Sequence, residues 1–460
     1  MSTPSLVVEG FKLFREARQG AVSVGISLVP RVILAATGLL STILLARGLG
    51  SDGLGKYALI ISISTLIMMF GDLGIGQTAV RFSSRAFSLQ DEPLHIRIMQ
   101  WAFRVRVVIV GTAAIAAIVI LPGVVQSVWR VPDILYLCFL SVATGVLTSI
   151  SMIPAVYYQS QKRYGMYALV QSAPSVVLLI GLLIMAVLHF WTLDLVVWVA
   201  LAGVAVSVLI FSQVIPASIF SWTIEKTGSM RQDIRTLFRA PHAQGSALEE
   251  LNPNRFAKYM FVASIIYSVT AKCDIWIMGS MLDSSQIGWY HVANRFCLPL
   301  IFLLEALNVV LWPKLSGFKR VEEALPFVKN FTKLFGLLSV LSLLYVFFAP
   351  LATTFFFGDQ YESSVNLARL LCFRYSISIL VSPIWIFGYS LGLEKQYWWV
   401  ATIQFAVVVA INLFLLPTLG VLAAAIAWVI HEIIAAVFIV FFVVMRVAKH
   451  QKPTQTADKG

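Results

Sequence analysis

The sequence predicts an all-α polytopic membrane protein with about twelve transmembrane helices in two six-helix lobes. Hydrophobic residues make up 59% of the chain and charged residues only 12%, whereas a soluble domain has about 25% charged residues. A transmembrane helix needs about 20 predominantly apolar residues, and runs of this length recur along the whole chain. The second half also repeats features of the first half at a constant spacing. Composition, run length and repeat therefore indicate the same class.

Twelve apolar runs are long enough to cross a bilayer, and they form two sets of six. The first set covers residues 22–46, 54–79, 102–124, 133–158, 165–190 and 193–219. The second set covers residues 259–281, 287–311, 327–349, 365–391, 397–416 and 418–445. The chain is therefore expected to divide into an N-terminal lobe at 1–220, a cytoplasmic linker at 221–258, a C-terminal lobe at 259–449 and a disordered cytoplasmic tail at 450–460.

The placement of basic residues predicts the orientation of the chain. The net charge is +12, but Lys and Arg occupy short loops between apolar runs and form no single polar face, which argues against a nucleic-acid partner. They concentrate in alternate connecting segments, beginning with the N-terminal segment and including the linker at 221–258. Because positively charged loops stay on the cytoplasmic side, both termini are expected in the cytoplasm.

The sequence offers no enzymatic or metal-binding motif. Its four cysteines lie inside apolar runs, without the spacing of a disulfide framework or a metal site. No phosphate-binding loop and no serine nucleophile motif occurs. The glycines at positions 71, 74 and 76 lie within the second expected span, where small residues favour close helix packing. We therefore expect neither an enzymatic active site nor a cofactor.

An internal repeat at an offset of 233 residues relates the two lobes. The matched positions are Gly55-Lys56-Tyr57 with Gly288-Trp289-Tyr290, Asp72 with Glu305, Arg81 with Lys314, and 161–164 with 394–397. Six spans separate the copies, and because six is even, both copies have the same topology. Parallel repeats of this kind are related by an axis along the membrane normal and place a substrate path at their interface.

The stretch Leu44–Arg85 and its second copy carry a resemblance to a known family. In the first copy the matching residues are 46–50, 53–57, 72–74 and Arg81, and in the second copy they are 274–279, 287–290 and Ala293. These residues resemble the signature of the polysaccharide transporter family, the O-antigen flippases. That family belongs to the multidrug/oligosaccharidyl-lipid/polysaccharide exporter superfamily.

The resemblance implies a fold, an activity and a location. The superfamily implies two six-helix lobes that form a V and open alternately to either side of the membrane. The family implies flipping of undecaprenyl-diphosphate-linked oligosaccharide repeat units across the bacterial inner membrane. Membrane lipids, and the polymerase and chain-length proteins of the same pathway, are the further partners expected. Coupling to a proton or sodium gradient is left open.

Charged residues inside the apolar spans are the candidate site residues. Each costs about 2.5–3.5 kcal/mol on insertion scales, so such residues face a cavity or a partner. The bases are Arg31, Lys272, Arg295, Arg369 and Arg374, and the acids are Asp72, Asp274, Glu305 and Glu432. Because guanidinium and ammonium groups suit a diphosphate, the expected substrate-binding residues are Arg31, Arg295, Lys272 and Arg374.

The remaining candidates are expected to act in gating or ion coupling. The repeat mates Asp72 and Glu305 lie near Arg81 and Lys314, which suggests inner-gate ion pairs. Asp274, His431 and Glu432 are candidates for ion coupling or for satisfied intramembrane pairs. In the eighth span, positions 291, 295, 298, 302, 305 and 308 recur at helical spacing and predict one polar stripe. Arg31 follows Pro30, and the alternative for its side chain is to reach the inner headgroups.

Two other functions remain as alternatives at this stage. An ion-coupled drug or cation antiporter of the same superfamily is expected to have membrane acids in excess of bases, and this chain has five candidate bases. A membrane glycosyltransferase or polymerase of the same pathway would need a sizeable external loop to hold its acceptor, and the expected outward loops are short.

Overall fold

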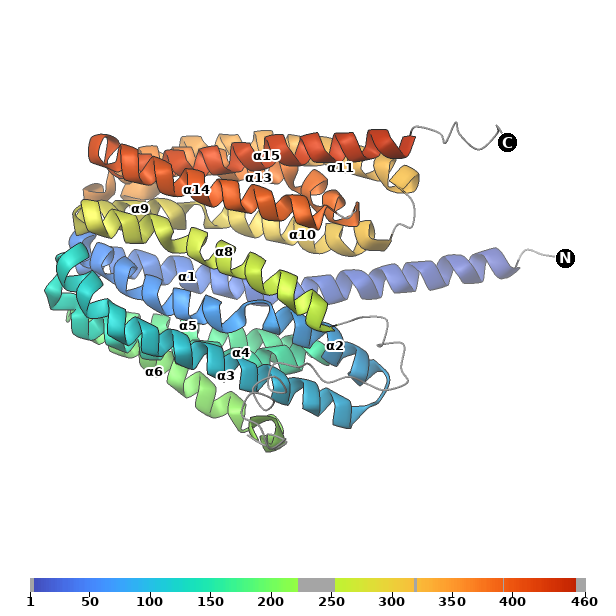
Figure 1. The fold of residues 1–460 in the computed structure, drawn as a ribbon, viewed down its shortest axis with the longest axis horizontal. Coiled ribbons are helices and arrows are strands. Elements are labelled where there is room, and N and C mark those ends of the chain that lie inside the picture. The colour runs from blue at the N-terminus through green and yellow to red at the C-terminus, as the bar shows by residue number, and fades with distance from the viewer. Residues whose placement is uncertain (1–3, 222–252, 318–320, 392, 452–460) are drawn as a thin grey trace.

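The computed structural model describes residues 4–221, 253–317, 321–391 and 393–451 as a bundle of long helices, with no strand among them. Figure 1 shows the helices of the first half (4–221) on one side of the bundle and those of the second half (253–451) on the other. The first helix of the described chain begins, and its last helix ends, at one end of the bundle, and α9 (Ser284–Phe296) lies at the opposite end (Figure 1). Most of the expected linker and most of the expected tail fall outside the described residues.

The first half contains six α-helices and three short helical turns among its described residues. These are α1 (Pro4–Asp72), α2 (Ile75–Ser88), α3 (Glu92–Gly123), η1 (Val124–Val128), η2 (Pro132–Ile134), α4 (Leu135–Ser160), α5 (Tyr164–Val187), α6 (Leu193–Ser212) and η3 (Ala217–Phe220).

The second half has a similar succession of elements. It contains α8 (Pro253–Met281), α9, α10 (Leu298–Gly317), α11 (Val321–Leu344), η4 (Tyr345–Phe348), α12 (Ala349–Phe357), η5 (Asp359–Tyr361), α13 (Ser364–Ser390), α14 (Glu394–Leu419) and α15 (Leu422–Gln451).

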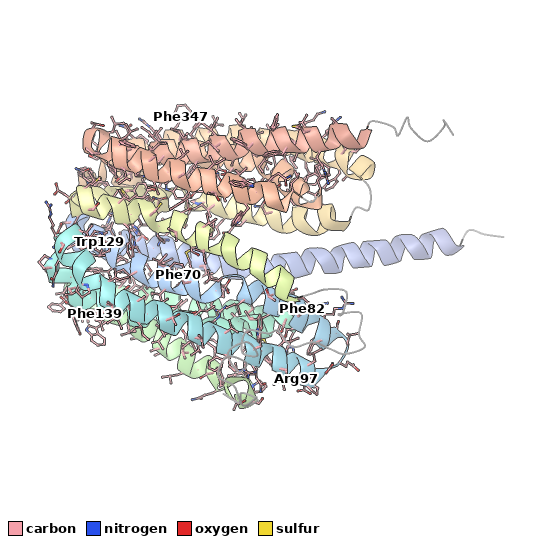
Figure 2. All side chains as sticks on the ribbon, viewed as in Figure 1. Phe70, Phe82, Arg97, Trp129, Phe139 and Phe347 are labelled. Atoms are coloured by element: carbon pink, nitrogen blue, oxygen red, sulfur yellow. The ribbon has the colours of Figure 1, made fainter. Side chains whose placement is uncertain are left out.

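The predicted all-helical membrane class is confirmed. Nine of the described helices are long and apolar enough to span a membrane, or ten when α9 and α10 count as one bent span. Large apolar side chains are exposed along these helices, as lipid contact requires, and Phe347 is 78% exposed on the outside of the bundle (Figure 2). The count of twelve spans stays a prediction.

Two glycines divide the helices of the opening hairpin. The first two expected spans merge into α1, which is kinked at Gly50, where φ is 70°. The second span does not continue to residue 79 as expected, because Leu73 and Gly74 have φ values of 32° and 82° and end the helix. Gly74 therefore breaks the helix in a positive-φ conformation that favours glycine. The expectation that Gly74 serves close packing within a span is wrong. The separate helix α2 follows.

The eighth expected span is also interrupted. Residues 287–311 form α9 and α10, which meet at Cys297 with a bend of 42°. Pro299 lies in the first turn of α10, where the missing N–H of proline is tolerated, but it could not continue the ladder of α9. The expected polar stripe from position 291 to position 308 assumed one straight helix, whereas the bend turns its second part by 42° relative to its first.

The packing of the core shows how the halves meet. One apolar cluster combines buried residues from both halves, including Leu45 and Tyr57 of α1 with Ile287 and Val292 of α9. A second cluster draws only on residues 75–219, and a third only on residues 311–443. The halves therefore share a core at the end where α9 lies, here called the closed end, and have separate cores elsewhere. This is the V-shaped arrangement that the resemblance implied.

The repeat mates Gly55 and Gly288 meet where α1 crosses α9. A Cβ atom on Gly55 would collide with the carbonyl oxygen of Ser284, and one on Gly288 would collide with the carbonyl oxygen of Ser51. Ser51 and Ser284 are themselves separated by 233 positions. Each half therefore presents the same glycine to the same carbonyl of the other half, as expected for a crossing on a pseudo-two-fold axis.

Hydrogen bonds between the halves cluster at the closed end. Arg47 of α1 donates to the carbonyl oxygens of Phe355 and Phe356, at 2.6 and 2.9 Å. Tyr361 donates to the carbonyl of Ala46 at 3.1 Å, and burial raises the pKa of its phenol, so it remains a neutral donor. Trp129, labelled in Figure 2, donates to the carbonyl of Trp276 at 3.2 Å.

Candidate functional site

Three basic or titratable side chains gather where α8 and α9 face α1. Lys272 comes from α8, and His291 and Arg295 lie four residues apart on α9, so their side chains share one helix face. Arg295 interacts electrostatically with both Lys272 and His291. On the opposing helix it interacts with the phenol of Tyr57. We call Lys272, His291 and Arg295 the basic cluster.

The local fold explains why Arg295 can occupy this position. It lies in the last turn of α9, directly before the bend at Cys297. The negative end of the helix dipole favours a cation there. Across from it, α1 carries Gly38, and a Cβ atom on that glycine would lie 3.9 Å from Nη1 of Arg295. The guanidinium is therefore at the boundary between the two halves.

The basic cluster carries an excess of positive charge. Within the described part of the chain, none of its three side chains donates a hydrogen bond or joins an ion pair that would neutralise it. Asp274 is the one described acid with an electrostatic effect on Lys272, and no described acid acts on Arg295. Lys272 and Arg295 thus carry two positive charges, and the only described acid near them, Asp274, is also bonded to other donors. The cluster can therefore bind a further anion.

Asp274 is held in place by aromatic donors. Its side chain is 3% exposed. Tyr290 donates a hydrogen bond to it at 2.6 Å, and the indole N–H of Trp428 on α15 donates another at 2.7 Å. The backbone N–H of Ile275 donates to its other oxygen at 2.7 Å. These three hydrogen bonds stabilise the carboxylate.

Arg374 has a different environment from the basic cluster. Its guanidinium carbon lies 4.0 Å from the ring centre of Trp428, and its Nε lies 3.7 Å from an oxygen of Glu432. His431 lies 3.7 Å from the same carboxylate oxygen and is hydrogen bonded to Gln404. Arg374 is therefore paired and stacked inside the second half, where it is less available to a ligand than Arg295.

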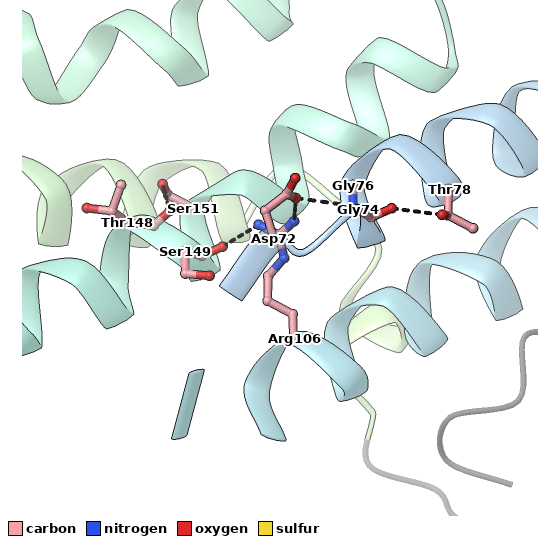
Figure 3. A network of polar contacts seen from close by, with 8 residues as sticks. All are labelled: Asp72, Gly74, Gly76, Thr78, Arg106, Thr148, Ser149 and Ser151. Carbon is pink, nitrogen blue, oxygen red and sulfur yellow. Dashed lines mark hydrogen bonds and ion pairs between the residues drawn. The ribbon is translucent and has the colours of Figure 1, made fainter. Parts of the chain in front are cut away.

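The acid of the opening hairpin, Asp72, pairs within the first half. Figure 3 shows its carboxylate accepting from the guanidinium of Arg106 on α3 and from the backbone N–H of Gly76. Arg106 is 1% exposed and also donates to the carbonyl of Ser149 on α4 at 2.9 Å. One buried arginine thus joins α1, α3 and α4 at the point where α1 ends.

We expect Arg106→Gln to destabilise the protein by about 1.5–3 kcal/mol, because it removes the charge-assisted hydrogen bond that a buried guanidinium makes to the half-exposed carboxylate of Asp72. Thermal unfolding in detergent, followed by intrinsic fluorescence, measures the effect. Arg97→Gln is the matched control, since Arg97 lies exposed on the same helix. Equal unfolding temperatures for the two variants would contradict the role assigned to Arg106.

The structure leaves part of the expected site undescribed. Arg31 lies in α1, but its side chain is outside the described residues, as are those of Arg81 and Lys314. Glu305 is exposed on α10. Arg369 is exposed near the start of α13 and donates to Asn366 at 3.1 Å. The inner-gate pairing of Asp72 and Glu305 with Arg81 and Lys314 therefore stays a prediction.

Two site residues were not assigned roles from the sequence. Arg106 is missing from the set of charges inside the spans, although it falls within the expected span 102–124. His291 appears only as a member of the polar stripe, although it lies one helical turn before Arg295. In both cases the only signal in the sequence was the position of the residue within an expected span. No group of three His, Cys, Asp or Glu side chains that could hold a metal occurs among the described residues.

Comparison with known proteins establishes the family. A family model described as "Polysaccharide biosynthesis protein" matches residues 44–366. The chain belongs to this family. A family relative, a Shigella flexneri protein described as "Putative O-antigen transporter", is 22% identical over 405 residues, which cover 86% of this chain and 90% of the relative.

Two solved structures have a fold similar to that of this family member. The lipid II flippase MurJ, in an inward closed conformation, aligns with a TM-score of 0.68 and 13% identity over 92% of this chain and 89% of that chain. A multidrug resistance MATE transporter of the MOP superfamily, in an inward-facing conformation, aligns with a TM-score of 0.64 and 13% identity over 94% and 99%. These likenesses concern the fold.

Proposed function

We propose that this family member flips undecaprenyl-diphosphate-linked oligosaccharide from the cytoplasmic to the periplasmic leaflet of the bacterial inner membrane. The observation that carries the proposal is the basic cluster at the boundary between the halves, where Asp274 acts on Lys272 but no described acid acts on Arg295. A diphosphate supplies the missing negative charge, and both Arg and Lys form charge-assisted hydrogen bonds to phosphate oxygens.

The family and its relative support a lipid-linked cargo. The matched family is one of polysaccharide biosynthesis, and the relative's description names O-antigen transport. A cationic drug is a poor fit to the basic cluster, because a third positive charge beside Lys272 and Arg295 would be repelled. The role is therefore that of a transporter, in preference to an antiporter for cations or to a glycosyltransferase.

The shared and separate cores support a mechanism of alternating access. With both termini in the cytoplasm, the closed end faces the periplasm, and the two halves have separate apolar cores toward the cytoplasm. The diphosphate enters between the halves and binds Arg295 and Lys272, with Arg31 as a further candidate, while the polyprenyl chain stays in lipid. The halves then part at the closed end, where Arg47 and Tyr361 release their carbonyl partners, and the headgroup leaves outward.

Deletion of the gene tests the function directly. Lipid-linked oligosaccharides should accumulate on the cytoplasmic side, detected by mass spectrometry of extracted lipids, and surface polysaccharide should fall. A plasmid copy of the gene should reverse both effects. Normal surface polysaccharide without any accumulated lipid-linked species would overturn the proposal.

A further inference from the structure

His291 lies inside the basic cluster, one helical turn from Arg295 on α9, with no hydrogen-bond partner among the described residues, and an imidazole is the side chain whose ordinary pKa lies closest to neutral pH. The groups acting on it are Arg295, one turn away on α9, and Lys272 on the facing helix α8. Asp274 lies near Lys272, and its oxygens are occupied by Tyr290, Trp428 and Ile275. From α1, the phenol of Tyr57 faces Arg295.

The sign of the surrounding charge decides the state of this imidazole. In the empty site two fixed cations repel a third positive charge. A bound diphosphate carries at least two negative charges and would outweigh them at the same distance. The interior of the bundle strengthens both effects, because charge interactions there are screened less than in water.

We propose that His291 is a third ligand of the diphosphate and that it binds a proton when the cargo binds. The neutral ring donates from one nitrogen only, whereas the protonated ring donates from both and adds a positive charge. The proton comes from water, and the cargo and the proton then occupy the site together. This inference rests on the proposed function, and it adds a proton-linked step to cargo binding.

Calorimetry on the purified full-length protein measures how many protons the protein takes up when it binds a diphosphate. The probe is farnesyl diphosphate, a soluble prenyl diphosphate, titrated at about pH 7.5, where a phosphate with a second pKa near 6 is already ionised. Titrations in two buffers of different ionisation enthalpy give the number of protons bound. The wild-type protein should take up about one proton per probe. Its affinity should fall as the pH rises, by at most about tenfold per pH unit.

His291→Gln should bind the probe without proton uptake and with an affinity that no longer depends on pH. The ring's charge-assisted hydrogen bond is also lost, so its affinity should be at least about tenfold weaker. His189→Gln is the matched control, because His189 is exposed beyond the end of α5 and should leave the proton count unchanged. His291→Asn serves as a second variant if the glutamine variant does not fold.

The outcomes separate this inference from the function on which it rests. Probe binding by the wild-type protein without proton uptake would overturn the role of His291 while leaving the diphosphate site intact. Proton uptake that persists in a folded His291→Gln protein would overturn it as well. Failure of the wild-type protein to bind the probe would overturn the proposed diphosphate site itself, and the role of His291 with it.

Discussion

Replacing both Lys272 and Arg295 with glutamine should abolish export of the lipid-linked oligosaccharide. Each side chain offers the diphosphate a charge-assisted hydrogen bond worth about 1.5–3 kcal/mol. Loss of two such bonds should weaken headgroup binding at least about a hundredfold. The measurement is surface polysaccharide in a deletion strain that carries the variant gene, together with the amount of accumulated lipid-linked oligosaccharide. Membrane levels of the variant protein must match those of the wild type.

Arg369→Gln is the matched control for this pair. It removes an exposed arginine from the same half of the protein, whose side chain donates a hydrogen bond to Asn366. Export should be unchanged. Normal export by the Lys272→Gln, Arg295→Gln variant at normal protein levels would refute the assignment of the headgroup to the basic cluster, whereas the deletion phenotype would still stand.

Gly55→Ala and Gly288→Ala should each disrupt the closed end and stop export. In both variants the new methyl group would overlap a carbonyl oxygen of the other half, so the crossing helices must move apart. Overpacking of this kind costs about 1–3 kcal/mol. Here it destabilises the conformation in which α1 and α9 are in contact. The two variants should behave alike, because the collisions are related by the repeat. Export assays and thermal unfolding measure both effects.

Gly111→Ala provides the comparison for the crossing glycines. Gly111 also lies within a helix, but a Cβ atom there would meet nothing within 4 Å. Alanine also has the higher helix propensity, so this variant should export normally and be no less stable. Export by Gly55→Ala equal to that of Gly111→Ala would show that the close crossing is not required.

The class of the protein could be predicted from the sequence because it depends on composition and on repeat spacing. Both are properties of the chain alone, and the offset between Gly55 and Gly288 reappears as a physical contact. The breaks were harder to predict, although Gly74 and Pro299 are residues that end helices. The residues around both positions are apolar, so a search for long apolar runs does not detect the helix ends there.

The partners of the charged residues could not be predicted in the same way. Which charges pair depends on the rotation of each helix about its axis, and this is determined by packing against distant segments. Arg374 is neutralised by Glu432 and stacked on Trp428, both from α15. Asp72 finds Arg106 on α3. Arg295, by contrast, has no described acid within reach, and this difference among similar arginines appears only in three dimensions.

The basic residues at the boundary between the halves are not repeated in both copies of the internal repeat. At an offset of 233, the positions that match Lys272, His291 and Arg295 are Leu39, Ala58 and Ser62. Every ion pair found among the described residues also joins groups of the same half. Reversing the V therefore requires no separation of opposite charges between those residues, and the bonds to be broken at the closed end are ones that water can replace. The basic cluster therefore lies in the second half alone, and the first half has neutral side chains at the three positions that match it.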